Sequence, residues 1–239
     1  MKLLAAVALA LALALAPAAV ADESVTLVQS GAGLYAANCT RCHGPQGQGV
    51  RDHGPSLKDA GALGADFYLR TGYMPLVNPS DQPERSRPVF TDRQIAKLVA
   101  FVASLGHGPP IPNPQPEHGN LSAGMQLFTD HCAGCHQEVA RGGYVTGARV
   151  PPLTDATVRQ IAEAVRQGPY LMPRFSKSAI SDAQLNDIIA YVQYAKHPDD
   201  RGGWSIGDVG PWPEGMVTWL LAAAVIVFTC TLVGRRLRA

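Results

Sequence analysis

Two short stretches of the chain hold the residues whose types and spacing could do chemistry. Residues 39–43 read C-T-R-C-H and residues 132–136 read C-A-G-C-H, so each follows the pattern C-x-x-C-H. Two cysteines at this spacing can each form a thioether with one vinyl group of the same porphyrin, and the following histidine can bind its iron. The sequence therefore predicts two covalently bound haem c groups. The predicted attachment residues are Cys39, Cys42, His43, Cys132, Cys135 and His136.

Zinc binding is the alternative interpretation of a C-x-x-C pair, because the same spacing occurs in structural zinc sites. The chain has five cysteines, and the two motifs use all of them except Cys230. No further cysteine pair remains to complete a four-ligand zinc site, and both motifs end in histidine. Haem attachment is therefore favoured over zinc.

Each iron needs a second axial ligand, and two methionines stand at matching places. Met74 and Met172 each precede a proline, 31 and 36 positions after His43 and His136. A thioether sulfur in this position is found in small cytochromes and raises the reduction potential. We predict that Met74 and Met172 are the second axial ligands. Irons with both axial positions filled favour one-electron transfer, so no catalytic site is expected within this chain.

The other histidines and methionines are given structural roles. We expect Met125, seven residues before Cys132, to lie in the core. The histidines that compete for the axial position have no counterpart in the other half of the chain, and we expect them at the surface. They are His53, His107, His118 and His131. Backbone carbonyls of Pro55 and Pro151 are candidate acceptors for the Nδ1–H groups of the two axial histidines.

The two motifs lie within an internal repeat that predicts two similar domains. Gly31, Leu34 and Tyr35 precede Cys39 at the same intervals as Gly124, Leu127 and Phe128 precede Cys132. Each half closes with a predicted amphipathic helix, which begins with a capping box at residues 91–94 or 181–184. The predicted buried stripes are Ile95, Leu98, Val99 and Val102 in one helix and Leu185, Ile188, Ile189 and Val192 in the other.

The expected fold is therefore all-α, with two tandem class I-like cytochrome c domains at residues 25–106 and 120–197. Residues 107–119 contain five prolines up to position 116, which disfavour helix and predict a stiff, extended linker that spaces the domains.

Both ends of the chain are strongly apolar. Residues 1–21 resemble a signal peptide with a cleavage site after Ala21, or alternatively a retained membrane segment. After a juxtamembrane segment at 198–215, residues 216–233 form an uncharged stretch long enough to span a bilayer, and an arginine-rich tail follows at 234–239. Because positive residues remain inside, we expect a cell-membrane protein with its haem domains outside and its C-terminus in the cytoplasm. A formal charge of +1 argues against nucleic acid as a partner.

The mature chain resembles a known family, the di-haem cytochrome c subunit of the actinobacterial cytochrome bc complex (menaquinol:cytochrome c reductase). The resemblance is carried by residues 34–44, 54–57 and 71–75 in the first half and by 168–175 and 187–192 in the second. The tail at 207–216, G-D-V-G-P-W-P-E-G-M, also resembles the family's approach to its membrane anchor.

The resemblance implies partners and a path for electrons. The chain would sit beside a cytochrome b subunit and a Rieske iron–sulfur subunit, as an electron-transfer subunit of a reductase in the translocase class. It would accept electrons from the Rieske protein and pass them to a terminal cytochrome c oxidase in a supercomplex. Two alternatives remain open at this point: a free-standing membrane-anchored electron carrier, and a di-haem redox enzyme with an open iron.

Overall fold

The computed structural model describes residues 25–81, 83–198 and 211–238 of the 239-residue chain. The predicted signal peptide at 1–21 lies outside these residues. The chain forms two units, Met1–His197 and Pro198–Ala239, which are described separately.

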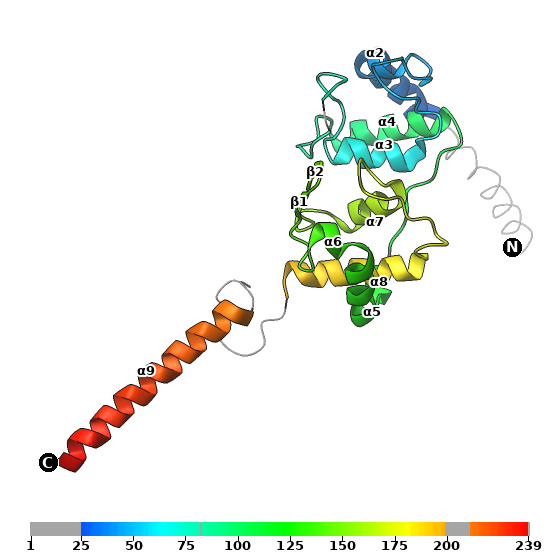
Figure 1. Cartoon of the computed structure of the whole chain (residues 1–239). Helices are drawn as coiled ribbons and strands as arrows, with labels where there is room; N and C mark the ends of the chain where they lie inside the picture. Colours follow the sequence, from blue (N-terminus) through cyan, green and yellow to red (C-terminus); the bar gives the residue numbers. More distant parts are fainter. Residues whose placement is uncertain (1–24, 82, 199–210, 239) are drawn as a thin grey trace, which may run out of the picture. The chain divides into compact units, whose positions relative to one another are not determined.

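The first unit contains two domains built from the same order of helices, which confirms the predicted all-α repeat (Figure 1). In the first domain a helix over 25–38 is followed by α2 (Thr40–His43), α3 (Gly61–Arg70) and α4 (Asp92–Ser104). The second domain has the equivalent helices in the same order. They are α5 (Leu121–His131), α6 (Ala133–His136), α7 (Val158–Gln167) and α8 (Asp182–Lys196).

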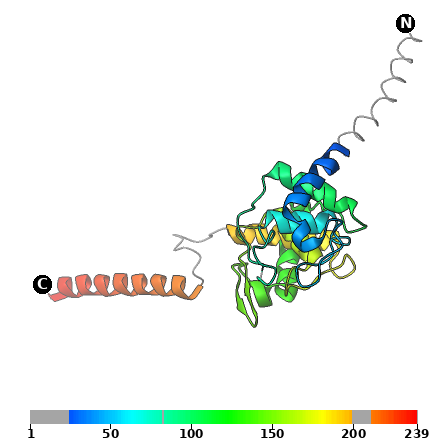
Figure 2. The same ribbon diagram turned by 90° about the horizontal axis from the view of Figure 1, so that it is seen from above.

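In each domain the first and last helices cross at a repeated glycine. A Cβ atom at Gly31 would lie 2.1 Å from the Lys97 carbonyl oxygen on α4, and one at Gly124 would lie 1.9 Å from that of Asp187 on α8. The absent side chain therefore allows the two backbones to touch. The crossing of the blue helix 25–38 over the helices beneath it can be followed in Figure 2.

The closing helices α4 and α8 begin and bury residues as predicted. Thr91 with Gln94, and Ser181 with Gln184, form complete capping boxes. All eight residues of the two predicted stripes are buried. A third capping box, Thr157 with Gln160, starts α7 and was not predicted.

A small hairpin in the second domain has no equivalent among the predicted elements. Strands β1 (Gly143–Val145) and β2 (Ala148–Val150) pair antiparallel, with Tyr144 opposite Arg149. The two-residue turn between them contains Gly147 with a φ of +86°, a conformation that glycine adopts without strain. In the first domain an isolated bridge between Val50 and Gly54 stands at this place.

The proline-rich segment packs on both domains instead of acting only as a spacer. The Pro109 carbonyl accepts a hydrogen bond from Leu63 N, and Ile111 packs against the first core. Gln115 N donates to Asn186 Oδ1 on α8 at 2.8 Å. The expectation of a helix-free linker also needs one correction, because Pro116–His118 forms a single 3-10 turn, η1, in which proline occupies a first-turn position that needs no N–H donor.

The two domains meet directly through α3 and α7. Asp66 and Glu163 are both buried at this contact, with 2% and 0% of their surface exposed. Arg70 Nε donates to Asp66 Oδ1 at 2.8 Å, and Arg159 Nη1 lies 3.8 Å from Asp66 Oδ2. The domain contact is therefore a charged one, with two carboxyl groups at its centre.

The second unit contains α9 (Pro211–Arg238), which is longer than the predicted span at 216–233. Residues Gly215–Leu237 form a helix long and apolar enough to cross a membrane, and it is the only one among the described residues. The predicted tail at 234–239 thus begins as part of the same helix.

Candidate haem sites

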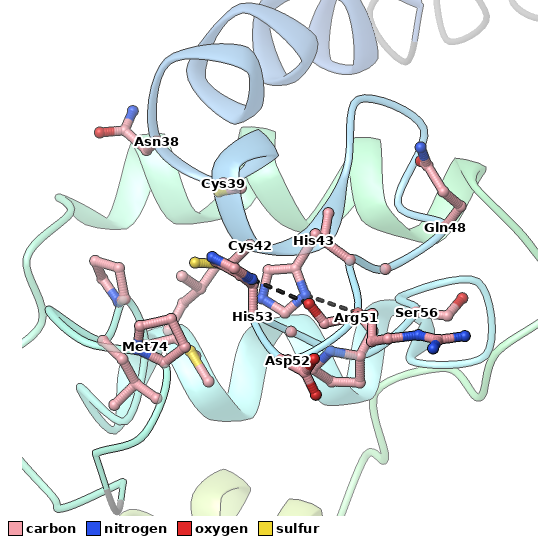
Figure 3. Close-up of a pocket in the computed structure, with 18 of the residues that line it drawn as sticks. Asn38, Cys39, Cys42, His43, Gln48, Arg51, Asp52, His53, Ser56 and Met74 are labelled. Atoms are coloured by element: carbon pink, nitrogen blue, oxygen red, sulfur yellow. Dashed lines mark hydrogen bonds between the residues drawn. The ribbon is translucent and has the colours of Figure 1, made fainter.

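The first candidate site is a cavity of about 630 Å³ built from the first domain (Figure 3). Cys39, Cys42 and His43 line it from α2 and the residue before it, and Met74 lines it from the loop after α3. Figure 3 shows the side chains of Cys42, His43 and Met74 directed toward the same space. The four residues predicted from the sequence are therefore brought together.

The imidazole of His43 is oriented by a backbone carbonyl. Its Nδ1 lies 2.8 Å from the Pro55 oxygen, which is the predicted acceptor. A proton on Nδ1 leaves Nε2 as the nitrogen available to a metal. The backbone of Pro55 thus orients this side chain as a candidate iron ligand.

The second candidate site is a cavity of about 430 Å³ that contains the other four predicted residues. Cys132, Cys135 and His136 line one part of it, and Met172 lines another, from the loop after α7. Both cavity volumes fall within the range of cofactor sites, roughly 300–1,000 Å³. Paired thiols, an imidazole and a thioether in one cavity fit the attachment and axial ligation of haem c.

The second histidine is more enclosed than the first. His136 is 9% exposed, and burial lowers its pKa, an effect that the nearby Pro151 carbonyl partly offsets. Its Nδ1 has no hydrogen-bond partner of ordinary geometry among the described residues, so the predicted bond to the Pro151 carbonyl is not formed with the geometry seen at His43. A neutral imidazole is the form that binds iron.

The first thiol of each motif is buried deeply enough to remain protonated. Burial raises the pKa of Cys39 and of Cys132 to about 11, and the second thiol of each motif adds to the shift. All five cysteines are free of disulfides. Both motifs therefore present thiols that can still be alkylated by a vinyl group.

At the two ends of each methionine loop an arginine contacts an aspartate, and this pairing was not predicted from the sequence. Arg70, at the end of α3, contacts Asp92 in the first turn of α4. Arg166, at the end of α7, donates to Asp182 Oδ1 at 2.9 Å and to the Ile180 carbonyl at 2.7 Å. The repeated positions of these residues in the two halves are the signal that could have revealed them.

The predictions for the other histidines and for Met125 have different outcomes. His53, His107, His118 and His131 are exposed, as expected, although His53 lines the first cavity and His131 the second. The expectation for Met125 was wrong: its side chain is 54% exposed, because it projects from the face of α5 that does not meet α8.

Known proteins resemble the chain in both domains and over most of its length. Residues 28–106 match the family model described as Cytochrome c, and residues 119–192 match the one described as Cytochrome C oxidase, cbb3-type, subunit III. A curated relative from Mycobacterium tuberculosis, the "Cytochrome bc1 complex cytochrome c subunit", is 38% identical over 91% of this chain and 81% of its own length. The chain belongs to this family.

Other relatives agree with this assignment. The protein of the same name from Corynebacterium diphtheriae is 33% identical over 88% of this chain and 81% of its own length. Among solved structures, reduced cytochrome c4 from Pseudomonas stutzeri is 20% identical and covers 71% of this chain and 97% of its own, with a TM-score of 0.24 that supports no further comparison. As in the family, the two cytochrome c domains imply covalently bound haem c.

Proposed function

We propose that this chain relays single electrons from a Rieske iron–sulfur protein to a terminal oxidase through two haem c groups. The single observation that carries the proposal is the same in both domains: each cavity gathers two thiols, an imidazole and a thioether from separate elements. Haem bound at such a site supplies an iron that cycles between two oxidation states.

The ligands are assigned as predicted from the sequence. Cys39 and Cys42 would hold the first haem, together with His43 and Met74 as ligands of its iron. Cys132 and Cys135 would hold the second, together with His136 and Met172. An iron held by two protein side chains would have no open position, which would disfavour binding of oxygen or peroxide and favour electron transfer. The methionine loops, each closed by an arginine–aspartate contact, hold the thioethers in place and limit the access of water.

The chain would act within a membrane complex. Membership of the family supports partners in the bc1 complex, of which we propose the cytochrome b and Rieske subunits as neighbours and an oxidase as the acceptor. The helix Gly215–Leu237 would anchor the chain. Arg235 and Arg236 at its end favour a cytoplasmic C-terminus, which puts the haem domains on the outer side.

Purification through this chain in mild detergent tests the proposal. We expect two haem c groups per chain, together with b-type haem and the electron paramagnetic resonance signal of a Rieske cluster. On addition of a reduced menaquinone analogue, haem c should be reduced, and an attached oxidase should reoxidise it.

Other results would support the alternatives. Haem c without haem b or a Rieske signal would mean a free-standing carrier. One haem per chain, or rapid cyanide binding by the oxidised protein, would indicate an open iron and overturn the proposed relay.

A further inference from the structure

The two cavities differ in which domain builds them. The lining of the first comes from the first domain alone. The second cavity is lined by its own domain and also by residues of the first domain, from α3 and the loop after it. These residues are Phe67, Tyr68, Tyr73, Pro83 and Arg85.

Three of these residues form an aromatic cluster between the two sites. The ring centroids of Phe67 and Tyr73 lie 5.8 Å apart, and those of Tyr68 and Tyr73 lie 6.2 Å apart. Tyr73 directly precedes Met74, the proposed ligand of the first iron, while its side chain lines the second cavity. One residue thus adjoins both sites.

Tyr73 and Arg85 bring hydrogen-bond donors to the second cavity. Tyr73 and Arg85 both line this cavity from the first domain, and the phenol hydroxyl and the guanidinium are hydrogen-bond donors. Arg85 Nη2 donates to Gln160 Oε1 at 2.9 Å and to the Asp155 carbonyl at 3.1 Å. Arg85 therefore reaches across the domain contact and is held at the rim of the second cavity.

The wall that α7 and α8 supply to this cavity is mainly apolar, with Ile161, Val165, Ile188 and Val192 among its residues. A haem has an apolar ring and one edge with two propionate carboxylates, which require donors or cations when they leave water. A guanidinium and a phenol that line the same cavity suit that edge, since arginine binds carboxylates through two parallel hydrogen bonds.

We propose that Arg85 and Tyr73 of the first domain are positioning residues for the second haem and donate to its propionates. The second haem site is then complete only when the two domains are packed together. This inference rests on the proposed function in one respect, the presence of a haem at Cys132 and Cys135.

The second domain offers one arginine of its own on the same cavity, Arg149 on β2. It provides the matched control, because Arg149→Gln removes the same charge from the same cavity on the other domain. Arg85→Lys keeps the charge without the planar fork, and Tyr73→Phe removes only a hydroxyl.

The test is a redox titration of the full chain in detergent, with two waves assigned by Met74→Ala and Met172→Ala. For Arg85→Gln we expect the reduced-to-oxidised ratio of the second haem at a fixed potential to fall roughly tenfold, since a nearby cation is lost. Tyr73→Phe should lower this ratio less, and Arg85→Lys should restore most of it. The wave of the first haem should move much less.

Three results would overturn the inference: no shift with Arg85→Gln, an equal shift of both waves, or a shift with Arg149→Gln in place of Arg85→Gln. A purely structural role for Arg85 would lower stability without changing either potential. The haem content separates this failure from failure of the proposed function, because a chain with one haem contradicts the latter whatever the potentials are.

Discussion

At the scale of single residues, the proposed chemistry depends most on the two loop methionines. Met74 and Met172 are half-buried and line the two cavities, whereas Met125 is exposed and lines neither. A thioether is a weak, neutral ligand that favours the reduced iron. The three methionines therefore provide two proposed ligands and one control for mutation.

Met172→Ala should lower the potential of the second haem and open its iron to added ligands. A decrease of roughly 100 mV or more is expected, since axial ligands move haem potentials over about 0.8 V. Redox titration, cyanide binding and the weak near-infrared band of methionine-bound ferric haem measure the effect. Met125→Ala should leave all three unchanged, and unchanged spectra for Met172→Ala would remove the ligand assignment.

Glu163 is the residue whose protonation is most strongly tied to folding. Burial raises its pKa to about 9, and the adjacent Asp66 contributes in the same direction. The unfolded chain releases this proton near its ordinary pKa of 4.5. Since the folded state holds the proton to higher pH, the associated stability is complete below about pH 4.5 and is lost as the pH rises through about 9.

Glu163→Gln should remove this dependence, because glutamine keeps the shape of the side chain but never ionises. At pH 8 we expect the variant to be more stable than the original protein by roughly 2–5 kcal/mol, with little difference at pH 5. Guanidinium unfolding between pH 5 and 9, followed by Soret circular dichroism, measures it. Glu117→Gln, at an exposed carboxylate on η1, is the control; parallel pH profiles for all three proteins would contradict the prediction.

At the scale of elements, each domain is organised by the crossing of its first and last helices. The backbones meet at Gly31 and at Gly124, so the apolar stripes of α4 and α8 can reach the core behind the haem motif. This contact leads directly into the C-x-x-C-H turn, and it therefore determines where the thiols and the histidine lie.

Gly31→Ala should destabilise the first domain by roughly 1–3 kcal/mol, because its Cβ would overlap the Lys97 carbonyl and push the helices apart. Gly33→Ala lies on the same helix with nothing within 4 Å of its Cβ. It should be neutral, or more stable by up to about 1 kcal/mol through helix propensity. Thermal unfolding measures the stability of both variants. Equal effects would mean that the helix crossing does not require a glycine at position 31.

At the scale of the whole molecule, the haem domains and the apolar helix α9 are separate units of the chain. The first unit has its own two cores, one around Tyr35 and one around Phe128. It has no structural need for α9, which makes membrane attachment a separable property.

A chain that ends at His197 should therefore fold and leave the membrane when it is expressed with its maturation machinery. We expect two haem c groups per chain in the soluble fraction, while a control with Gly215–Leu237 replaced by an equally long leucine–alanine helix stays in the membrane. Fractionation and haem staining measure both. Expression without the other subunits of the complex excludes retention through them, and retention of the shortened chain under this condition would contradict the prediction.

The sequence by itself determined the features that depend on residues close together in the chain. The haem motifs, the methionines before prolines and the two capping boxes are each defined within a few positions, and the repeat made them comparable. Six of the eight predicted site residues lie in the two haem motifs for this reason, and Met74 and Met172 were found together through their matching places in the repeat.

Only the tertiary structure decided how the two domains meet. The buried Asp66–Glu163 pair, the bonds of Arg85 to Gln160 and Asp155, and the first-domain wall of the second cavity all join residues far apart in the chain. Such contacts leave no local pattern, because charged side chains are usually exposed and their burial depends on what packs over them. The exposed Met125 shows the same limit, since a single apolar residue on a helix does not reveal which face is covered.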